Sequence, residues 1–496
     1  MNNLRLRQIL LYRFYEMLPG IFVWVIFGLA LYFTFFKPLL AIYFVIAFAV
    51  YWLIKAVYLA TFLLYSFKQY KEAIKINWFL KVKKIKDWDK YYHLIFLPTY
   101  KEGIEIVRPT FVALTKSNYP TKKFIIALCG EEKDKENFLK IASLTQKEFA
   151  PYFFKFFVFV HPQGLKDEIQ GKGSSTHFAG KKVKEIIDEL GIPYEKVIVS
   201  NFDIDTCVHP EYFAHLTYKY LTIPSPTLTS YQPVAIFNNN IWQSPALTRV
   251  VSRGTTFWLL TELSKPELYF TFSSHSMSFK ALVEVGFWDK DVVSEDSRIF
   301  LQCFNHYNGN YKVVPLHIPV SMDTVYAGSL LKTLKNQYRQ ILRWGYGAEN
   351  VAYMLWYFWK NKKISFFKKI KPFWTQFAGS CSWATVPILL IFLGNVPVLI
   401  AKVEGFKEAI VYNTPFILSW LMTLAMIGIF VMAALSTLLL PPAPSKSNFL
   451  RYLGMILQWL LFPVTMVAFG SIPAAEGITR LMLGKYLGFR TTEKSR

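Results

Sequence analysis

Three side chains in the second half of the sequence have the types and spacing of a site for a phosphorylated sugar. Gln340, Arg343 and Trp344 are three and four positions apart, so a helix would place them on one face. The amide and the guanidinium suit phosphate oxygens, and the flat indole suits the apolar face of a sugar ring. The alternative is a basic stripe on lipid headgroups, which accounts for the lysines nearby but not for a Trp beside an Arg and a Gln. The spacing therefore favours a sugar-phosphate site.

A pair of aspartates follows a strand-like apolar run. Asp203 and Asp205 flank one apolar residue shortly after the run Val197–Asn201. Hard carboxylate oxygens at the carboxyl end of a strand suit Mg²⁺ or Mn²⁺, and such a cation would bridge a diphosphate. Two loop aspartates or a helix cap would give the same pattern, so the pair by itself is compatible with both interpretations.

A second acidic pair, Glu295 and Asp296, precedes an apolar-periodic segment, Arg298–Tyr307. One interpretation makes Ser294 the N-cap of a helix whose first turn carries acids that complement its dipole. The other makes Asp296 a general base, whose carboxylate takes a proton from an attacking hydroxyl. Both can hold together, because a helix N-terminus also fixes the position of the carboxylate.

Two weaker signals lie earlier in the chain. Thr99, Tyr100 and Glu102 end the first strand-like run, where an aromatic ring could stack on a nucleobase and a carboxylate could bond its edge. Lys172 stands between two glycines, and a flexible backbone could bring it against a diphosphate. A simple turn explains these glycines at least as well.

The elements that must position these groups alternate along residues 71–350. Short apolar runs predict strands at His93–Leu97, Phe124–Leu128, Phe153–Val160, Val197–Asn201 and Tyr231–Phe237. Charged segments between them predict helices at Glu102–Thr115, Lys133–Phe149 and Ala179–Leu190. Such alternation predicts an α/β fold with a mostly parallel sheet and helices on both faces. Ligands of these sheets lie at the carboxyl ends of the strands, which is where we expect the chemistry.

Both ends of the chain are apolar enough to cross a membrane. The 496 residues are 53% hydrophobic and 18% aromatic, with a mean hydropathy of +0.26, which is too apolar for an ordinary soluble protein. Residues 17–36 and 38–54 predict an amino-terminal helical hairpin, and the uncharged stretches 372–401, 409–445 and 452–475 predict three further spans. Basic residues on both sides of the hairpin place the middle of the chain in the cytoplasm. We therefore expect a multi-pass protein of the inner or plasma membrane.

The number of predicted spans conflicts with the charge of the carboxyl-terminal tail. An odd number of spans puts that terminus outside, whereas its basic residues argue for the inside. Pro463 and Pro473 make the last stretch the candidate for a re-entrant segment. The predicted domains are a transmembrane hairpin at 1–70, a cytosolic domain at 71–350, and an interfacial helix, further spans and a tail at 351–496.

Net charge and cysteine usage argue against other classes. The formal net charge of +23 suits a protein that faces the anionic cytoplasmic leaflet, and no nucleic-acid motif accompanies it. The four cysteines are scattered without a CxxC pair, which predicts neither a disulfide framework nor a zinc site. Membrane lipids, and not nucleic acid, are therefore the expected partners of the basic residues.

The order of these motifs resembles that of family-2 inverting glycosyltransferases with a GT-A fold. Pro-Thr-Tyr-Lys-Glu, Gly-Lys-Gly, Asp-x-Asp, Glu-Asp and Gln-x-x-Arg-Trp follow one another from Pro98 to Trp344. The resemblance is closest to the membrane-integrated branch that includes cellulose, chitin and hyaluronan synthases and ceramide glucosyltransferase. A last element, residues 489–494, resembles the gating loop that covers the donor site in cellulose synthases. The resemblance implies an α/β GT-A (Rossmann-like) cytosolic glycosyltransferase domain inserted between amino- and carboxyl-terminal transmembrane helices.

The resemblance also implies a role for each matching residue. Asp205 would ligate Mg²⁺ or Mn²⁺, Asp296 would be the catalytic base, and Trp344 would form a platform for the acceptor sugar. Gln340 and Arg343 would contact the diphosphate. The implied set comprises the catalytic residues Glu295, Asp296, Gln340, Arg343 and Trp344, the metal ligand Asp205, and the donor-binding residues Thr99, Tyr100, Glu102, Glu131, Lys172, Asp203, Phe489, Thr492 and Lys494.

Two departures from the family pattern bear on the donor and the product. Glu131, in a Cys-Gly-Glu-Glu run, stands where the family usually has an aspartate cluster, so the donor could be a GDP-sugar although a UDP-sugar is favoured. Thr491 replaces the usual Val of the gating loop, and the chain ends two residues after Lys494. Processive synthases often continue into further spans, so the resemblance leaves gating and polymer translocation open.

The expected reaction moves a sugar from a nucleotide-diphosphate sugar to an acceptor hydroxyl in a single displacement that inverts the anomeric centre. One interpretation of the product is a growing β-linked polysaccharide, exported through the helices of the enzyme, which the gating-like tail favours. The other is a membrane lipid that receives one sugar, which the modest number of spans favours. A non-catalytic scaffold or transporter is a third alternative, and five motifs in one order argue against it.

Overall fold

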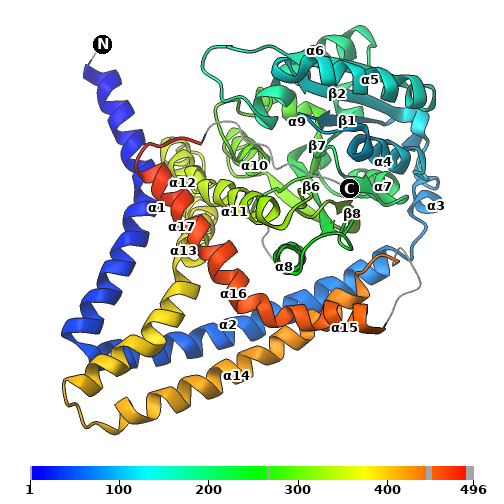
Figure 1. Cartoon of the computed structure of the whole chain (residues 1–496). Coiled ribbons are helices and arrows are strands. Elements are labelled where there is room, and N and C mark those ends of the chain that lie inside the picture. Colours follow the sequence, from blue (N-terminus) through cyan, green and yellow to red (C-terminus); the bar gives the residue numbers. More distant parts are fainter. Residues whose placement is uncertain (1–2, 266–268, 443–448, 488–496) are drawn as a thin grey trace.

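The computed structural model describes residues 3–265, 269–442 and 449–487. Its α/β domain is built on an eight-stranded mixed sheet (Figure 1). In their order across the sheet, the strands are β3 (Lys155–His161), β2 (Phe124–Glu131), β1 (Tyr92–Pro98), β4 (Val197–Asn201), β7 (Ser276–Ser278), β6 (Thr229–Phe237), β8 (Lys312–Met322) and β5 (Cys207–Val208). The strands from β3 to β4 run parallel, as do β6 and β8, whereas β7 is antiparallel to both of its neighbours and β5 to β8.

Helices cover both faces of the parallel half, which explains its continuous apolar runs. In β1, Ile95 and Leu97 pack into the core on one face, and Leu94 and Phe96 into the core on the other. All four are fully buried. The helices of this domain are α3 (Trp78–Val82), α4 (Ile104–Thr115), α5 (Lys135–Phe149), α6 (Lys172–Glu189), α7 (Tyr212–Thr222), α8 (Ala246–Leu263), α9 (Phe279–Glu284), α10 (Glu295–His306), α11 (Leu330–Tyr346) and α12 (Glu349–Tyr353).

The predicted fold class is confirmed: six of the eight strands run parallel to one another, and the reversed strands β5 and β7 make this mostly parallel sheet mixed. The five predicted strands are present as β1, β2, β3, β4 and β6. Helix α6 begins at Lys172, whereas the prediction began it at Ala179. The prediction missed the first turns because they are filled by polar residues. Strands β5, β7 and β8 were not predicted: β5 and β7 are too short for a pattern, and Pro315 and Pro319 interrupt β8.

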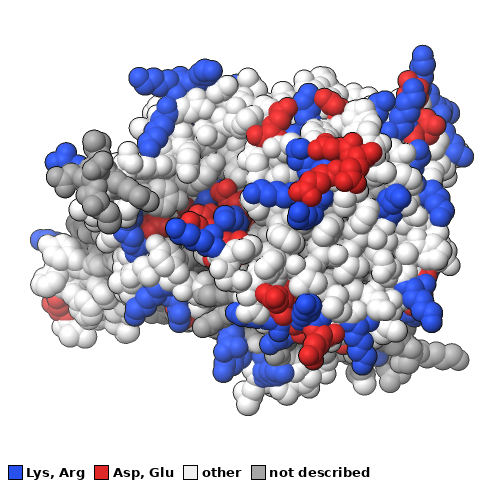
Figure 2. Space-filling view, turned by 90° about the horizontal axis from the view of Figure 1, so that it is seen from above, with Lys and Arg blue, Asp and Glu red and all other residues white. Residues whose placement is uncertain are grey.

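The outer face of the α/β domain intermixes acidic and basic side chains. Figure 2 shows Lys and Arg next to Asp and Glu over much of this face. Exposed ion pairs on its helices are of this kind, such as Arg108 with Glu148 at 2.7 Å and Lys184 with Asp188 at 2.8 Å. The net charge of +23 is therefore not gathered into one continuous basic field on the face seen in Figure 2.

Five helical stretches among the described residues are long and apolar enough to cross a membrane. Four are α1 (Asn3–Phe36), α2 (Pro38–Ala73), α13 (Phe366–Val403) and α14 (Ala409–Leu438). The turn between α1 and α2 meets the turn between α13 and α14, where Ile42, Val398 and Val411 pack together. Figure 1 shows both turns at the end remote from the α/β domain. The two helices of each pair diverge from their turn at a wide angle, so that α1 lies beside α13 and α2 beside α14 (Figure 1).

The fifth stretch is broken into α15 (Phe449–Leu457), α16 (Phe462–Met466) and α17 (Ile472–Met482). Pro463 and Pro473 lie in the first turns of α16 and α17. Met455 packs on Trp242 of the α/β domain, and Arg13 of α1 donates to the carbonyl of Met482 at 2.6 Å. Both ends of this stretch thus lie towards the α/β domain (Figure 1). A re-entrant course for this stretch, with four crossings and the basic tail inside, stays a prediction.

The helix that carries Gln340, Arg343 and Trp344 packs closely on the last helix. A Cβ at Gly345 of α11 would lie 2.7 Å from Cα of Ala474 in α17. A Cβ at Gly477 would lie 2.5 Å from the carbonyl of Leu342. Only glycine allows this approach, so α17 sets the position of α11.

Candidate active site

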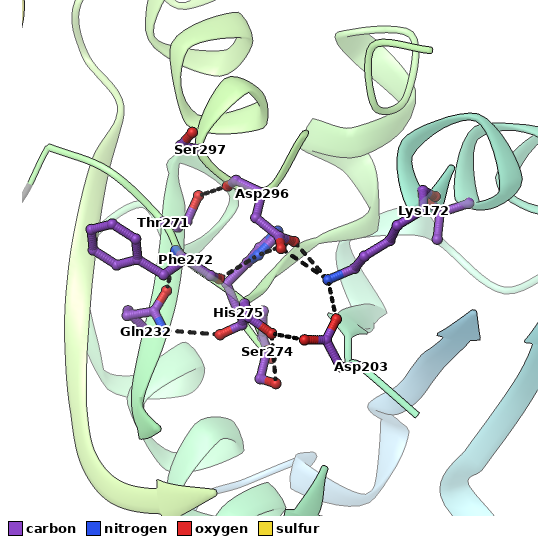
Figure 3. A network of polar contacts seen from close by, with 12 residues as sticks. Lys172, Asp203, Gln232, Thr271, Phe272, Ser274, His275, Asp296 and Ser297 are labelled. Carbon is purple, nitrogen blue, oxygen red and sulfur yellow. Dashed lines mark hydrogen bonds and ion pairs between the residues drawn. The ribbon is translucent and has the colours of Figure 1, made fainter. Parts of the chain in front are cut away.

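Lys172 joins the two acidic pairs at the carboxyl edge of the sheet. Its ammonium lies 2.9 Å from Oδ1 of Asp203, and 3.0 and 2.9 Å from Oδ1 and Oδ2 of Asp296 (Figure 3). Lys172 is the first residue of α6, Asp203 follows β4, and Asp296 is the second residue of α10. Three motifs that were predicted separately therefore meet at one point.

The charges at this point shift two pKa values. Burial by itself would lower the pKa of Lys172, but the surrounding carboxylates, Asp203 first among them, hold this pKa above its ordinary value. Burial and the charge of Asp296 raise the pKa of Glu295 to about 8. The cations Lys172 and Arg343 oppose that rise. At neutral pH, Lys172 is therefore charged and Glu295 is largely protonated.

Three residues that the sequence did not single out hold these carboxylates. The Ser273 hydroxyl donates to Oδ2 of Asp203 at 2.7 Å, and the Thr271 hydroxyl donates to the main-chain carbonyl of Asp296 at 2.5 Å. His275 is fully buried, with Nδ1 3.6 Å from Oδ1 of Asp296 and 3.1 Å from a main-chain carbonyl. Burial lowers the pKa of His275, so the imidazole is neutral at pH 7. In the sequence, the only signal for Thr271, Ser273 and His275 is a short polar run without periodicity.

The glycine after Lys172 allows close packing between α6 and α10. A Cβ at Gly173 would lie 2.9 Å from the carbonyl oxygen of Asp289 and 3.0 Å from Cβ of Glu295. No larger residue fits without a shift of one helix. The Gly-Lys-Gly run therefore begins α6 and places Lys172 directly against the start of α10.

Helix α10 begins at Glu295, and Ser294 stands at the predicted N-cap position with both acids in the first turn. Ser294 occupies the N-cap position without a side-chain bond to the helix, and its hydroxyl donates to Oε1 of Glu349 at 2.8 Å. The same oxygen accepts the main-chain N–H groups of Val293 at 2.9 Å and of Ser294 at 3.0 Å. Glu349, which the sequence did not single out, is 8% exposed. Its carboxylate fixes the turn that leads into Glu295 and Asp296.

Asp205, the predicted metal ligand, is fully buried beneath the site. Its Oδ2 accepts the N–H of Asp323 at 2.8 Å, and its carbonyl accepts from Asn239 at 2.9 Å. Within the part of the chain that the structure describes, no group of three or more His, Cys, Asp or Glu side chains is arranged to hold a metal ion. Mg²⁺ often takes one or two protein carboxylates and completes its shell with phosphates and water. The hard oxygens of Asp203 and Asp205 therefore fit a cation that arrives with a diphosphate.

The predicted helix through Gln340, Arg343 and Trp344 is confirmed as the second half of α11. Gln340 and Trp344 line a narrow cleft together with Asp323 and one face of α8. Arg343 lies close enough to Glu295 to oppose the rise of its pKa. Because the N–H of Asp323 also bonds Asp205, this cleft adjoins the aspartate pair.

The residues assigned to the nucleobase follow β1 and β2. Oε2 of Glu102 accepts from the Thr99 hydroxyl at 2.8 Å and from the N–H of Tyr100 at 2.5 Å. Glu131 is 2% exposed, and its Oε2 lies 3.1 Å from Nδ1 of His161. These contacts give the loop after β1 a fixed shape and turn one oxygen of Glu131 towards the interior.

The structure thus brings most of the predicted residues to one edge of the sheet. Lys172, Asp203 and Asp296 are in direct contact, and Glu295 and Arg343 act on them through their charges. The other predicted site residues that the structure describes lie in the adjoining cleft, beneath the site, or at the ends of β1 and β2. Phe489, Thr492 and Lys494 lie outside the described residues.

An α/β sheet with acidic groups at its carboxyl edge, between hydrophobic helices, is the architecture of a membrane glycosyltransferase with a GT-A-type domain. The model of the family described as "Glycosyl transferase family group 2" matches residues 198–470, more than half of the chain, so the chain belongs to this family. No curated protein sequence matches it.

Distantly similar solved structures include a mannosyltransferase and TarS. A mannosyltransferase from Pyrobaculum calidifontis, PcManGT, in complex with GDP-Man and Mn²⁺, is 12% identical with a TM-score of 0.41. The match covers 75% of this chain and 99% of that one. Residues 1–349 of S. aureus TarS, in complex with UDP-GlcNAc, are 12% identical with a TM-score of 0.36, over 68% of this chain and 89% of that one. The family match and the geometry of the site, rather than these likenesses, support the function that follows.

Proposed function

We propose that this chain is an inverting glycosyltransferase that moves a sugar from a nucleotide-diphosphate donor onto a growing β-linked polysaccharide. The observation that carries this proposal is the contact of Lys172 with both Asp203 and Asp296. Phosphate oxygens form strong charge-assisted bonds with ammonium groups, so a diphosphate would compete with the carboxylates for Lys172. The site is thus suited to take up a donor and to respond to its charge.

Asp296 would act as the general base. A bound diphosphate would draw the ammonium of Lys172 towards itself and leave the carboxylate of Asp296 to accept a proton. The acceptor oxygen would then attack the anomeric carbon while the bond from that carbon to the diphosphate breaks, and its proton would pass to Asp296. His275, neutral and fully buried, would pack beside this carboxylate. One displacement inverts the centre, so an α-linked donor would yield a β-linked product.

The leaving diphosphate would be stabilised by cations already present. Lys172 and Arg343 would lie against its oxygens, and Gln340 would donate from the same face of α11. Glu295, protonated at neutral pH, would add no opposing charge. A divalent cation, Mg²⁺ or Mn²⁺, would be held by Asp205 and would supply further charge neutralisation when bound.

The nucleoside would lie over the ends of β1 and β2. Thr99, Tyr100 and Glu102 form a loop fixed by its own hydrogen bonds, and Tyr100 would stack on the base. Glu131 would read its edge. UDP-sugars and GDP-sugars present a diphosphate of the same charge to Lys172, so this contact does not distinguish them. We favour a UDP-sugar because the family resemblance does.

The acceptor would meet Trp344, its platform, at the cleft between α8 and α11, which has a volume of about 10 Å³ and would have to widen to admit a sugar. The α/β domain, residues 71–350, would face the cytoplasm of a cell whose inner or plasma membrane holds the hydrophobic helices. A second candidate acceptor is a single membrane lipid. One observation supports the lipid. Helix α8 forms one wall of this cleft and packs on α2 through Leu63, Val250 and Phe257, so the cleft lies close to the hydrophobic layer.

The size of the product tests these proposals. The full chain in lipid nanodiscs would be incubated with Mg²⁺ or Mn²⁺ and one radiolabelled nucleotide sugar at a time. A ladder or high-mass product supports the polysaccharide, and a single product with lipid mobility supports the lipid acceptor. Asp296→Asn serves as the control: it should bind the donor but lose transfer by about 10²–10⁴-fold. Unchanged transfer by this variant would remove Asp296 as the base.

A further inference from the structure

Three arginines lie where the α/β domain meets the hydrophobic helices. Arg249 and Arg253 belong to α8, and Arg451 belongs to α15. Figure 1 shows α8 between the sheet and the layer of α2, α15 and α16. Arg451 is exposed, Arg249 is half-buried, and Arg253 is only 1% exposed. The cluster therefore extends from the surface into the interior of this boundary.

The hydrogen-bond donors of these arginines are incompletely used. Both terminal nitrogens of Arg253 reach the carbonyl of Leu439 at 3.4 Å, and its Nε has no partner among the described residues. Arg249 donates to Sδ of Met455 at 3.2 Å and to the carbonyl of Trp242 at 3.3 Å, and its Nε likewise finds no acceptor in the described chain. A guanidinium has five N–H donors, and buried donors are nearly always paired. Several donors here can therefore bond the oxygens of an anion.

No acid balances the charge of this cluster within the described ranges. Burial lowers the pKa of Arg253 to about 10, and Tyr70 opposes that change. Burial and the charge of Arg451 lower the pKa of Arg249. Elsewhere a buried arginine has an acidic partner, as Arg298 has Asp289 at 3.2 Å. An anion would therefore remove repulsion that nothing else in the described part of the cluster offsets.

One structural role explains Arg253 but not its neighbours. Leu439 is the C-cap residue of α14, and a cation there complements the helix dipole. Arg249 and Arg451 meet instead at Trp242: Arg249 bonds its carbonyl, and the guanidinium of Arg451 lies 4.9 Å from the centre of its ring. Two cations at one residue call for a different explanation.

The surroundings of the cluster are apolar and lie at the ends of membrane helices. Trp242 packs with Ile241 and Met455, and the cluster adjoins the last turns of α2 and α14 on the side of the α/β domain. Guanidinium groups over apolar side chains at such a position suit a lipid, whose phosphate lies at headgroup depth above its acyl chains. We propose that Arg249 and Arg451 bind the phosphate of an anionic membrane lipid.

Binding there would act on the acceptor cleft through a single helix. The opposite face of α8 places Val251, Ser252 and Thr255 in the cleft that Trp344 lines. A lipid phosphate between α8 and α15 would hold α8 against the membrane helices and so fix one wall of the cleft. The lipid site does not depend on the proposed reaction, because it stands on contacts outside the catalytic residues.

The test is lipid binding by the full chain in detergent, measured by native mass spectrometry with phosphatidylglycerol or phosphatidylcholine. We expect the phosphatidylglycerol adduct to be preferred, and the double variant Arg249→Gln/Arg451→Gln to weaken that preference by roughly tenfold or more, as loss of two cations near headgroups implies. Lys140→Gln, which removes an exposed cation of α5 in the α/β domain, is the matched control and should bind like the wild type.

Three results would overturn the assignment. Equal binding of the two lipids, or equal binding by wild type and double variant, would show that the arginines do not select an anionic lipid. Displacement of the adduct by millimolar inorganic phosphate would assign the site to a free anion instead. The single variant Arg451→Gln, at an exposed position, keeps the test valid if the double variant does not fold, and it should show a smaller loss of the same kind.

Discussion

Oδ2 of Asp296 lies 2.9 Å from the ammonium of Lys172, so the proposed base is held in an ion pair when no donor is bound. Both oxygens of this carboxylate face the ammonium, so an acceptor hydroxyl would meet oxygens that are already engaged. The same ammonium lies 2.9 Å from Asp203. A diphosphate that attracts Lys172 would therefore prepare the base at the moment the donor arrives, which links donor binding to proton transfer.

Replacement of Lys172 by Gln should lower kcat/KM for the nucleotide sugar by on the order of 10²-fold. The variant loses a charge-assisted contact with the diphosphate and leaves Asp203 and Asp296 without the cation between them. Steady-state transfer of radiolabelled sugar measures this change. Lys182→Gln is the control, since Lys182 lies on the same helix but is exposed and pairs with Glu185, away from the two aspartates. A Lys172 variant with wild-type kcat/KM would contradict the role of the ammonium.

Glu349 should behave as a positioning residue. Glu349→Ala removes the acceptor of three hydrogen bonds from Val293 and Ser294, so the turn before the acidic pair loosens. We expect kcat to fall about tenfold with little change in KM, and the free energy of unfolding to fall by about 1–3 kcal/mol. Glu349→Gln keeps an oxygen acceptor and should restore most of kcat. An alanine variant with unchanged kcat, or a KM effect alone, would argue against positioning.

The raised pKa of Glu295 predicts that the folded protein loses stability as pH rises. Burial and Asp296 raise this pKa from 4.5 to about 8, so between these values the folded state holds a proton that the unfolded state releases. The contribution is full below pH 4.5 and lost above pH 8, with a slope of at most about 1.4 kcal/mol per pH unit. Thermal unfolding of wild type and Glu295→Gln between pH 5 and 9 should show the wild type declining relative to the variant. If the stabilities of wild type and variant changed in parallel with pH, the raised pKa of Glu295 would be contradicted.

The sequence predicted the half of the fold and site that depends on local pattern. Strand ends are local, and carboxyl ends of parallel strands meet at one edge, so Asp203 and the loop that holds Lys172 could be expected near each other. The periodicity of α11 likewise placed Gln340, Arg343 and Trp344 on one helix. The roles of these residues remain proposals, since their placement alone does not test them.

The residues that sequence analysis missed depend on contacts between distant segments. Ser273 lies 70 positions from Asp203, and Glu349 lies 55 positions from Ser294. Strand β7, which brings the polar run around Ser273 to the site, has three residues and inserts antiparallel between β4 and β6. No periodicity marks so short a strand, and a lone Glu after a helix has no motif. Packing, rather than pattern, determines these positions.

Gly345→Ala should reduce both stability and transfer by pushing α11 away from α17. The added Cβ would lie 2.7 Å from Cα of Ala474, a backbone atom that cannot turn aside. Overpacking of this kind costs about 1–3 kcal/mol, and the displaced helix carries Arg343 and Trp344, so we expect kcat/KM to fall at least tenfold. Gly379→Ala is the matched control, because Gly379 also lies in a helix but its Cβ would meet nothing within 4 Å. Thermal unfolding and sugar transfer, measured together, decide the matter: if Gly345→Ala and Gly379→Ala behave alike, the contact between α11 and α17 does not position the site.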